Sequence, residues 1–125
     1  SWQEANTAQK GYELNTSLQA VICDRLERNN SLTTKLPATR ELLNLSADNL
    51  ILMALQISDR NLGMRCYESS GMETNIQIQS DLNWELVRQV DCLGREQLLD
   101  KPLGLMQPYK IASFKLGNMS ADKHR

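Results

Sequence analysis

The N-terminal quarter of the chain has apolar residues at helical spacing. They recur every three or four positions, at Leu14, Leu18, Val21, Ile22 and Leu26. Residues 3–28 contain no proline and a single glycine, so this periodicity predicts one amphipathic helix of about seven turns. Its first half is mostly polar, which is typical of a helix whose first turns project beyond its own domain.

A loop and a short helix are expected next, over residues 29–47. Asn29, Asn30 and Ser31 end the helical periodicity and predict the loop. Residues 37–47 begin with Pro37, which suits the first turn of a helix, and then carry several leucines. This segment therefore predicts a short helix.

From residue 48 onward, short apolar runs alternate with turn residues. The runs cover residues 50–57, 62–67, 75–79, 84–91 and 109–116. In one of them Ile76 and Ile78 alternate with Gln77 and Gln79, which indicates an antiparallel sheet with one covered and one solvated face. We expect this sheet to span residues 48–117 and a polar, flexible tail to follow over 118–125.

The apolar face of such a sheet needs a cover. The only long amphipathic element in the sequence is the helix within residues 1–28. The pattern therefore predicts an α+β fold, in which this helix packs on an antiparallel meander within a single domain over residues 1–125. The packing face of the helix is expected to comprise Leu14, Leu18, Ile22 and Leu26.

Composition and charge narrow the class of protein. A chain of 125 residues fits one core, and 14 basic residues dispersed among 15 acidic ones give a net charge of −1, which attracts no polyanion. We therefore expect no nucleic-acid partner.

No apolar run approaches the roughly 18 residues that span a bilayer, and the first residues do not form a signal peptide. Because the sequence begins without Met inside a predicted helix, we expect an upstream segment that holds a membrane anchor.

The sequence offers no recognisable catalytic chemistry. The candidate carboxylate pairs, Glu68 with Glu73 and Asp91 with Glu96, lie in predicted turns, where solvated carboxylates are expected. The single histidine, His124, lies in the tail and leaves a serine or cysteine nucleophile without a positioned base. The cysteine spacings match no zinc pattern, and no nucleotide-binding or metalloprotease motif is present. We predict no enzymatic activity, no cofactor, no metal and no small-molecule substrate.

One short segment indicates an alternative function. Residues 36–42, LPATREL, resemble the stretch that opens the helix-turn-helix of GntR-type winged-helix repressors. A recognition helix with basic and hydroxyl side chains should follow it. Residues 46–55 are instead acidic at their start and then strongly apolar. A small DNA-binding regulator is therefore the alternative and not the leading interpretation.

The order of elements along the whole chain resembles that of a minor pilin of a type IV pilus, or a minor pseudopilin of a type II secretion system, with its transmembrane segment removed. Four segments carry the similarity. The first two are residues 22–28, where the helix would begin to pack on its sheet, and residues 46–52, at the entry to the first strand. The other two are residues 84–90 followed by Asp91-Cys92-Leu93-Gly94, and a closing strand at 109–116. Together they cover roughly residues 5–117.

This resemblance implies a structural role. The expected function is that of a minor subunit of a bacterial type IV filament or pseudopilus, acting in assembly or at the tip, with other pilin or pseudopilin subunits as partners. The expected location is the inner membrane facing the periplasm, and then the filament. In that oxidising compartment two of the three cysteines should form a disulfide. Cys66 with Cys92 is the favoured pair and Cys23 is the competitor.

Overall fold

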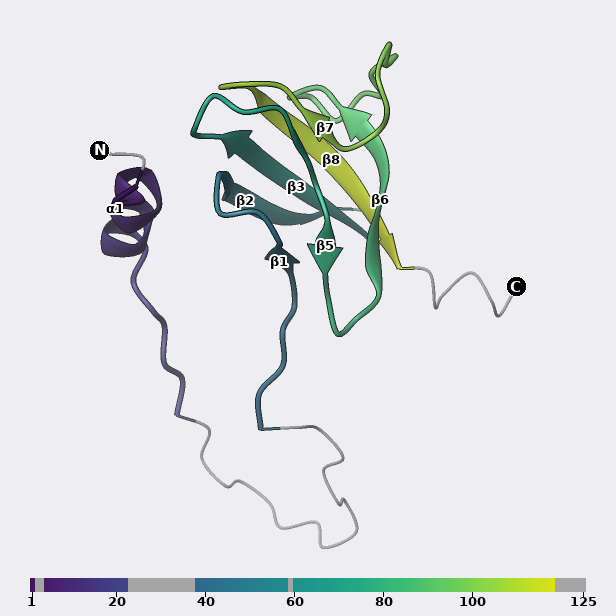
Figure 1. Cartoon of the computed structure of the whole chain (residues 1–125). Coiled ribbons are helices and arrows are strands. Elements are labelled where there is room, and N and C mark those ends of the chain that lie inside the picture. Colours follow the sequence, from purple (N-terminus) through teal and green to yellow (C-terminus); the bar gives the residue numbers. More distant parts are fainter. Residues whose placement is uncertain (2–3, 23–37, 59, 119–125) are drawn as a thin grey trace, which may run out of the picture. The chain divides into compact units, whose positions relative to one another are not determined.

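The chain divides into two compact units, Ser1–Arg40 and Glu41–Arg125. A computed structural model describes residues 1, 4–22, 38–58 and 60–118, and Figure 1 traces them along the sequence.

In the described residues of the first unit there is one short helix, α1, over Thr7–Asn15. The helix ends where Thr16 adopts extended dihedrals, φ −118° and ψ 92°. The side-chain amide of Asn15 donates to the carbonyl oxygen of Gly11 at 2.9 Å and so satisfies one carbonyl of the last turn. Within the described residues no helix has both the length and the apolar character needed to cross a bilayer.

The prediction of a long helix packed on the sheet is wrong. Helix α1 stops before most of the apolar positions, and Leu14, Leu18 and Ile22 are 83%, 101% and 93% exposed. Leu26 lies outside the described residues. Helices of this length are marginal unless an apolar face packs on a partner. Here the apolar positions of the segment have no such partner in the described part of the chain, and residues 16–22 do not form a helix.

The second unit is built on a four-stranded antiparallel sheet. Its strands are β2 (Leu50–Ser58), β3 (Asn61–Glu68), β6 (Trp84–Val90) and β8 (Ile111–Asn118), in the order β2-β3-β8-β6. These strands confirm four of the predicted runs. The predicted meander is wrong, because the last strand, β8, lies between β3 and β6 (Figure 1).

Two short strand pairs complete the second unit. Strand β1 (Asn44–Leu45) pairs with β5 (Ile78–Gln79), and β4 (Thr74–Asn75) pairs with β7 (Leu105–Met106). The predicted run 75–79 is thus divided between two partners. The short helix predicted within 37–47 is not formed in residues 38–47, which instead run into β1.

The core lies on one face of the sheet. Every second register pair of β3 and β8 points to this face and is buried, namely Leu62 with Leu116, Met64 with Phe114, and Cys66 with Ala112. The segments that contain the short strands cover them, since Ile76, between β4 and β5, and Met106 of β7 belong to the same buried cluster, with Leu45 and Ile78 packed against it. The cover that sequence analysis assigned to the N-terminal helix therefore comes from the segments between the long strands.

Candidate binding groove

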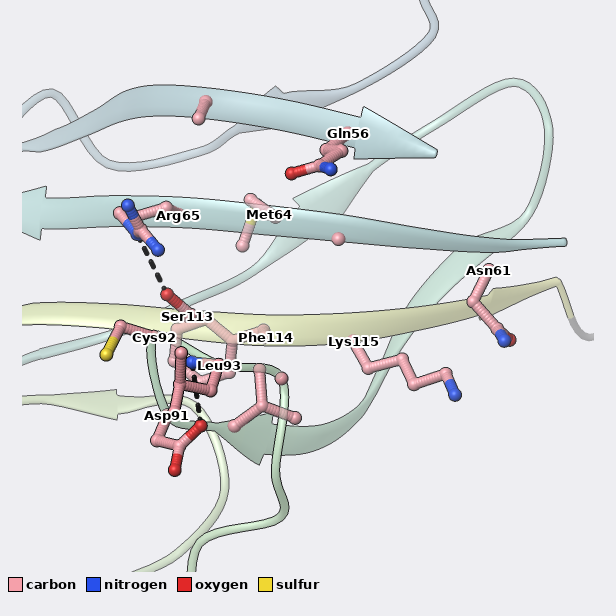
Figure 2. A pocket seen from close by; sticks show the side chains of 14 residues that line it. Gln56, Asn61, Met64, Arg65, Asp91, Cys92, Leu93, Ser113, Phe114 and Lys115 are labelled. Carbon is pink, nitrogen blue, oxygen red and sulfur yellow. Dashed lines mark hydrogen bonds between the residues drawn. The ribbon is translucent and has the colours of Figure 1, made fainter. Parts of the chain in front are cut away.

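The opposite face of the sheet carries an open groove of about 480 Å³. Side chains from β2, β3 and β8 form its floor, and the turn after β6 forms one wall (Figure 2). The groove lies on the opposite side of the sheet from the apolar cluster, because the lining residues Asn61, Gly63 and Arg65 alternate along β3 with the buried residues Leu62, Met64 and Cys66.

Strand register arranges the groove face in rows. Residues that are directly opposite in antiparallel strands project to the same face. One row across the sheet is Ala54, Arg65, Ser113 and Val90, and the next is Gln56, Gly63, Lys115 and Arg88. Irregularities in β2, between Leu52 and Ala54, and in β6, between Leu86 and Arg88, bring these residues into register.

Small residues make the middle of the groove hollow. Gly63 on β3 has Ala54 of β2 and Ser113 of β8 as its diagonal neighbours, and these three small residues leave the space above Gly63 open. A Cβ atom added to Gly63 would meet only the carbonyl oxygen of Gln56, at 3.5 Å, which is an ordinary contact. The backbone thus tolerates a side chain at position 63, and glycine there serves to keep the groove open.

Two cations frame the hollow. Arg65 donates from Nε to the hydroxyl oxygen of Ser113 at 3.0 Å, and Lys115 lies toward the other end of the groove (Figure 2). Neither forms an ion pair within the part of the chain that the structure describes. Sequence analysis did not single out these residues. The alternation of apolar and polar residues in β3 and β8 indicated that Arg65 and Lys115 are exposed. Only the strand register shows that they lie close together on one face of the sheet.

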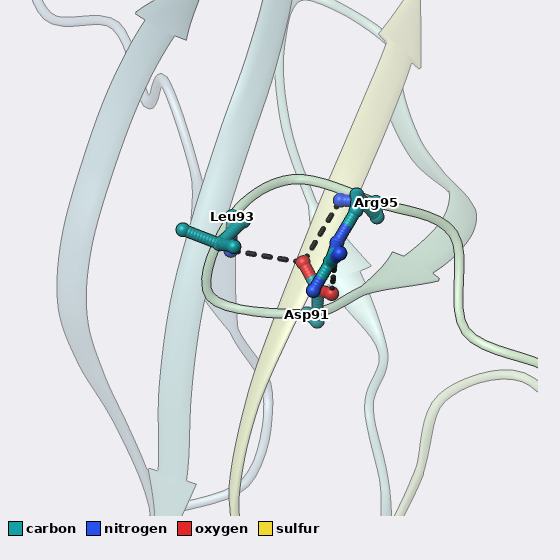
Figure 3. A network of polar contacts seen from close by, with 3 residues as sticks. All are labelled: Asp91, Leu93 and Arg95. Atoms are coloured by element: carbon teal, nitrogen blue, oxygen red, sulfur yellow. Dashed lines mark hydrogen bonds and ion pairs between the residues drawn. The ribbon is translucent and has the colours of Figure 1, made fainter.

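The turn after β6 is held rigid by Asp91. Its Oδ1 accepts hydrogen bonds from the backbone N–H groups of Leu93 and Arg95, both at 2.9 Å, and its Oδ2 accepts one from Arg95 Nε at 2.8 Å (Figure 3). The Arg95 backbone N–H is the largest cause that lowers the pKa of Asp91. Gly94 supplies the positive φ of 82° that this turn needs. The carboxylate therefore fixes Cys92 and Leu93 as the wall of the groove.

Glu68 is a buried carboxylate on the core side and not a solvated turn residue, so the prediction for it is wrong. It has no exposed surface, and its oxygens accept hydrogen bonds from Asn49 Nδ2 at 3.0 Å and from three backbone N–H groups, those of Ser70 at 2.7 Å, Gly71 at 2.8 Å and Tyr109 at 2.9 Å. Burial raises the pKa of Glu68, but hydrogen bonds, led by that from Tyr109, outweigh burial and lower the pKa to about 2. Its proposed companion Glu73 is exposed and pairs at 3.9 Å with Lys101.

Cys66 and Cys92, the pair favoured for a disulfide, are both free thiols in the structure. The side chain of Cys66 is buried in the core, where burial raises the pKa of its thiol to about 11. Cys92 is exposed on the wall of the groove, on the other side of the sheet. The sheet therefore separates the two thiols. The competitor Cys23 lies outside the described residues.

The other predicted features are placed as follows. Residues 50–55, in which the DNA-binding alternative required a recognition helix, form part of β2. Asp91 binds its own turn, while Glu96 pairs with Arg88 at 3.6 Å, so the two carboxylates do not act as a pair. Among the described residues, no group of three His, Cys, Asp or Glu side chains is arranged to hold a metal ion.

Comparison with known proteins yields no relative. No family model matches the sequence, and neither a curated protein nor a solved structure is significantly similar to this chain.

Proposed function

We propose that this chain is a non-catalytic minor subunit of a bacterial type IV filament or type II secretion pseudopilus, and that it contacts neighbouring subunits through residues 14–22. The observation that carries the proposal is the exposure of four apolar side chains in this segment. Leu14, Leu18, Val21 and Ile22 are each more than four-fifths exposed.

These side chains recur at helical spacing, although helix α1 ends at Asn15. A partner that covers them would gain about 1.5–3 kcal/mol for each side chain fully buried. The same contact would extend the helix, because an amphipathic helix of this length depends on packing more than on intrinsic propensity. We therefore expect residues 14–22 to fold against the corresponding segment of a neighbouring subunit.

The sequence resemblance supports the filament class. Residues 46–52 and 84–94 carry the phrases similar to those of minor pilins, and in the structure they form the entry to β2 and the strand β6 with its turn. The proposal does not include a helix packed on the sheet. On this proposal the full-length protein is anchored in the inner membrane facing the periplasm before it is assembled.

The test uses the producing bacterium, its sheared filament fraction and an antibody to this chain. The wild-type protein should be present in that fraction, and the double variant Leu18→Gln/Ile22→Gln should be depleted from it at least about tenfold, because two apolar contacts are lost. Leu98→Gln is the matched control, since Leu98 is fully exposed in the second unit, and should leave incorporation unchanged. Absence of the wild type from filaments, or equal incorporation of the double variant, would contradict the proposal.

A further inference from the structure

We propose that the groove on the open face of the sheet binds an extended acidic peptide segment of a partner protein, with carboxylates of two of its residues placed on Arg65 and Lys115. This proposal rests on the second unit alone and does not depend on how residues 14–22 assemble.

Arg65 and Lys115 have no ion-pair partner among the described residues, whereas Asp91, which also lines the groove, is paired with Arg95. Arg88 and Lys115 are direct register partners on β6 and β8, so two like charges face each other across the sheet. Such pairs are destabilising. Arg88 is engaged on one side by Glu96 at 3.6 Å, but its buried Nε has no hydrogen-bond partner among the described residues. An anion beside Lys115 would relieve this repulsion.

The spacing of the cations matches an extended chain. Arg65 is the register partner of Ser113, and Lys115 lies two residues further along β8, so Arg65 and Lys115 are diagonal neighbours. The Cα atoms of residues in that relation are about 7–8 Å apart, and the long side chains of Arg65 and Lys115 extend from them toward opposite ends of the groove (Figure 2). Alternate side chains of an extended peptide are also about 7 Å apart on one face. The two cationic side chains can therefore reach carboxylates of two peptide residues that are separated by at least one residue.

The size and lining of the groove favour a peptide over a simple anion. Its 480 Å³ falls within the range of ligand pockets, about 300–1,000 Å³, and is far more than a phosphate ion fills. Gln56 offers an amide to a peptide backbone, and Val90 and Leu93 offer apolar contact beside the cations. Binding of single-stranded nucleic acid uses exposed aromatic side chains for stacking, whereas the aromatic residue of this lining, Phe114, is buried.

The proposal is tested by fluorescence anisotropy with the whole chain and a fluorescein-labelled peptide, acetyl-Ser-Thr-Glu-Val-Glu-Val-Thr-Ser-Gly-amide. A second peptide with both glutamates replaced by glutamine is the ligand control. The acidic peptide should bind at least about tenfold more tightly than the neutral one, because each carboxylate gains a charge-assisted contact. Its affinity should fall as salt is raised.

Variants locate the binding site. Arg65→Gln and Lys115→Gln should each weaken binding about tenfold, and Gly63→Val should abolish it by filling the hollow without changing charge. Lys110→Gln is the matched control, because Lys110 is exposed just before β8 and does not line the groove, and should leave affinity within about twofold. Near-ultraviolet circular dichroism of each variant establishes that the fold is kept, and Arg65→Lys should recover part of the lost affinity.

Four results would overturn the proposal. The first is no anisotropy change at millimolar protein, and the second is equal affinity for the acidic and neutral peptides. The third is displacement of the acidic peptide by inorganic phosphate at concentrations close to the peptide dissociation constant, which would make the groove a simple anion site. Unchanged binding by a folded Gly63→Val variant would place the peptide elsewhere and would likewise contradict it.

Discussion

The backbone N–H of Tyr109 donates a 2.9 Å hydrogen bond to Oε2 of Glu68, which lies 41 residues earlier in the chain. Tyr109 has a positive φ of 56°, a conformation that a non-glycine residue adopts only when its surroundings hold it there. The carboxylate at the end of β3 thus fixes the turn that starts β8. This bond joins the two central strands of the sheet at the end remote from the β2–β3 turn.

We expect Glu68→Gln to destabilise the second unit by about 2–4 kcal/mol. Hydrogen bonds to a buried charged group are worth about 1.5–3 kcal/mol, and a glutamine presents an N–H₂ group where an acceptor is needed. Urea unfolding at neutral pH measures the change. Glu85→Gln is the matched control, since Glu85 is exposed on β6, and should change stability by less than about 0.5 kcal/mol. Equal stability of the two variants would mean that Glu68 does not fix the fold.

The same residue predicts a dependence of stability on pH. The pKa of Glu68 is lowered from 4.5 to about 2 on folding. A carboxyl with a lower pKa in the folded state stabilises the protein above its unfolded pKa, and that contribution is lost as pH falls toward the folded pKa. The wild type should therefore lose about 3 kcal/mol between pH 4.5 and 2 through this group.

Urea titrations across this pH range check the prediction. The free energy of unfolding of the wild type should approach that of Glu68→Gln as pH falls, since the variant lacks the titrating carboxyl. The pKa of Asp91 is also lowered, but Asp91 is present in both proteins and cancels in the difference. A constant difference from pH 4.5 to 2 would rule out Glu68 as the source.

The strands of the main sheet were predictable because their signal is local. Strand β3 alternates apolar and polar or small residues from Asn61 to Glu68, and the apolar ones are all buried. Burial of Glu68 at the end of the same alternation was not predictable in this way. Its partners Asn49 and Tyr109 are distant in sequence, and a turn glutamate is normally solvated.

The cover of the sheet and the groove depend on non-local pairing. The helical periodicity up to Leu26 predicted that a helix covers the apolar face of the sheet. Segments with short strands, such as Leu105–Met106, cover it instead, and strands of two residues have only a weak sequence pattern. The insertion of β8 between β3 and β6 then brings Arg65 and Lys115 onto one face. No spacing along the sequence encodes that insertion, so the cations were not recognised as a pair.

Two substitutions distinguish the observed core from the expected one. Phe114→Ala should cost about 3–5 kcal/mol, because Phe114 is fully buried between β3 and β6. Leu18→Ala should change the stability of the isolated chain by less than about 0.5 kcal/mol, since Leu18 is fully exposed. Both values come from chemical denaturation monitored by tryptophan fluorescence. A loss of 2 kcal/mol or more for Leu18→Ala would restore the packed-helix architecture.

The thiols provide the last prediction, and it tests the separation of Cys66 from Cys92 by the sheet. In a Cys23→Ser background, one thiol should react rapidly with Ellman's reagent in the native protein, and that thiol is Cys92, because it is exposed. The thiol of Cys66 has a pKa of about 11, so at pH 8 only about one molecule in a thousand carries the reactive thiolate. Burial blocks the reagent as well, and Cys66 should react only after denaturant is added.

The variant Cys23→Ser/Cys92→Ser isolates Cys66 and should show no rapid reaction. Its labelling rate should follow the unfolding equilibrium as denaturant is raised, because the thiol becomes accessible only when β3 leaves the core. Rapid native labelling of this variant would mean that Cys66 is not buried. Failure to titrate any thiol in the denatured, non-reduced Cys23→Ser protein would establish a Cys66–Cys92 disulfide. Such a disulfide requires that the two side chains lie on the same side of the sheet. That arrangement would contradict the register of β3 with β8.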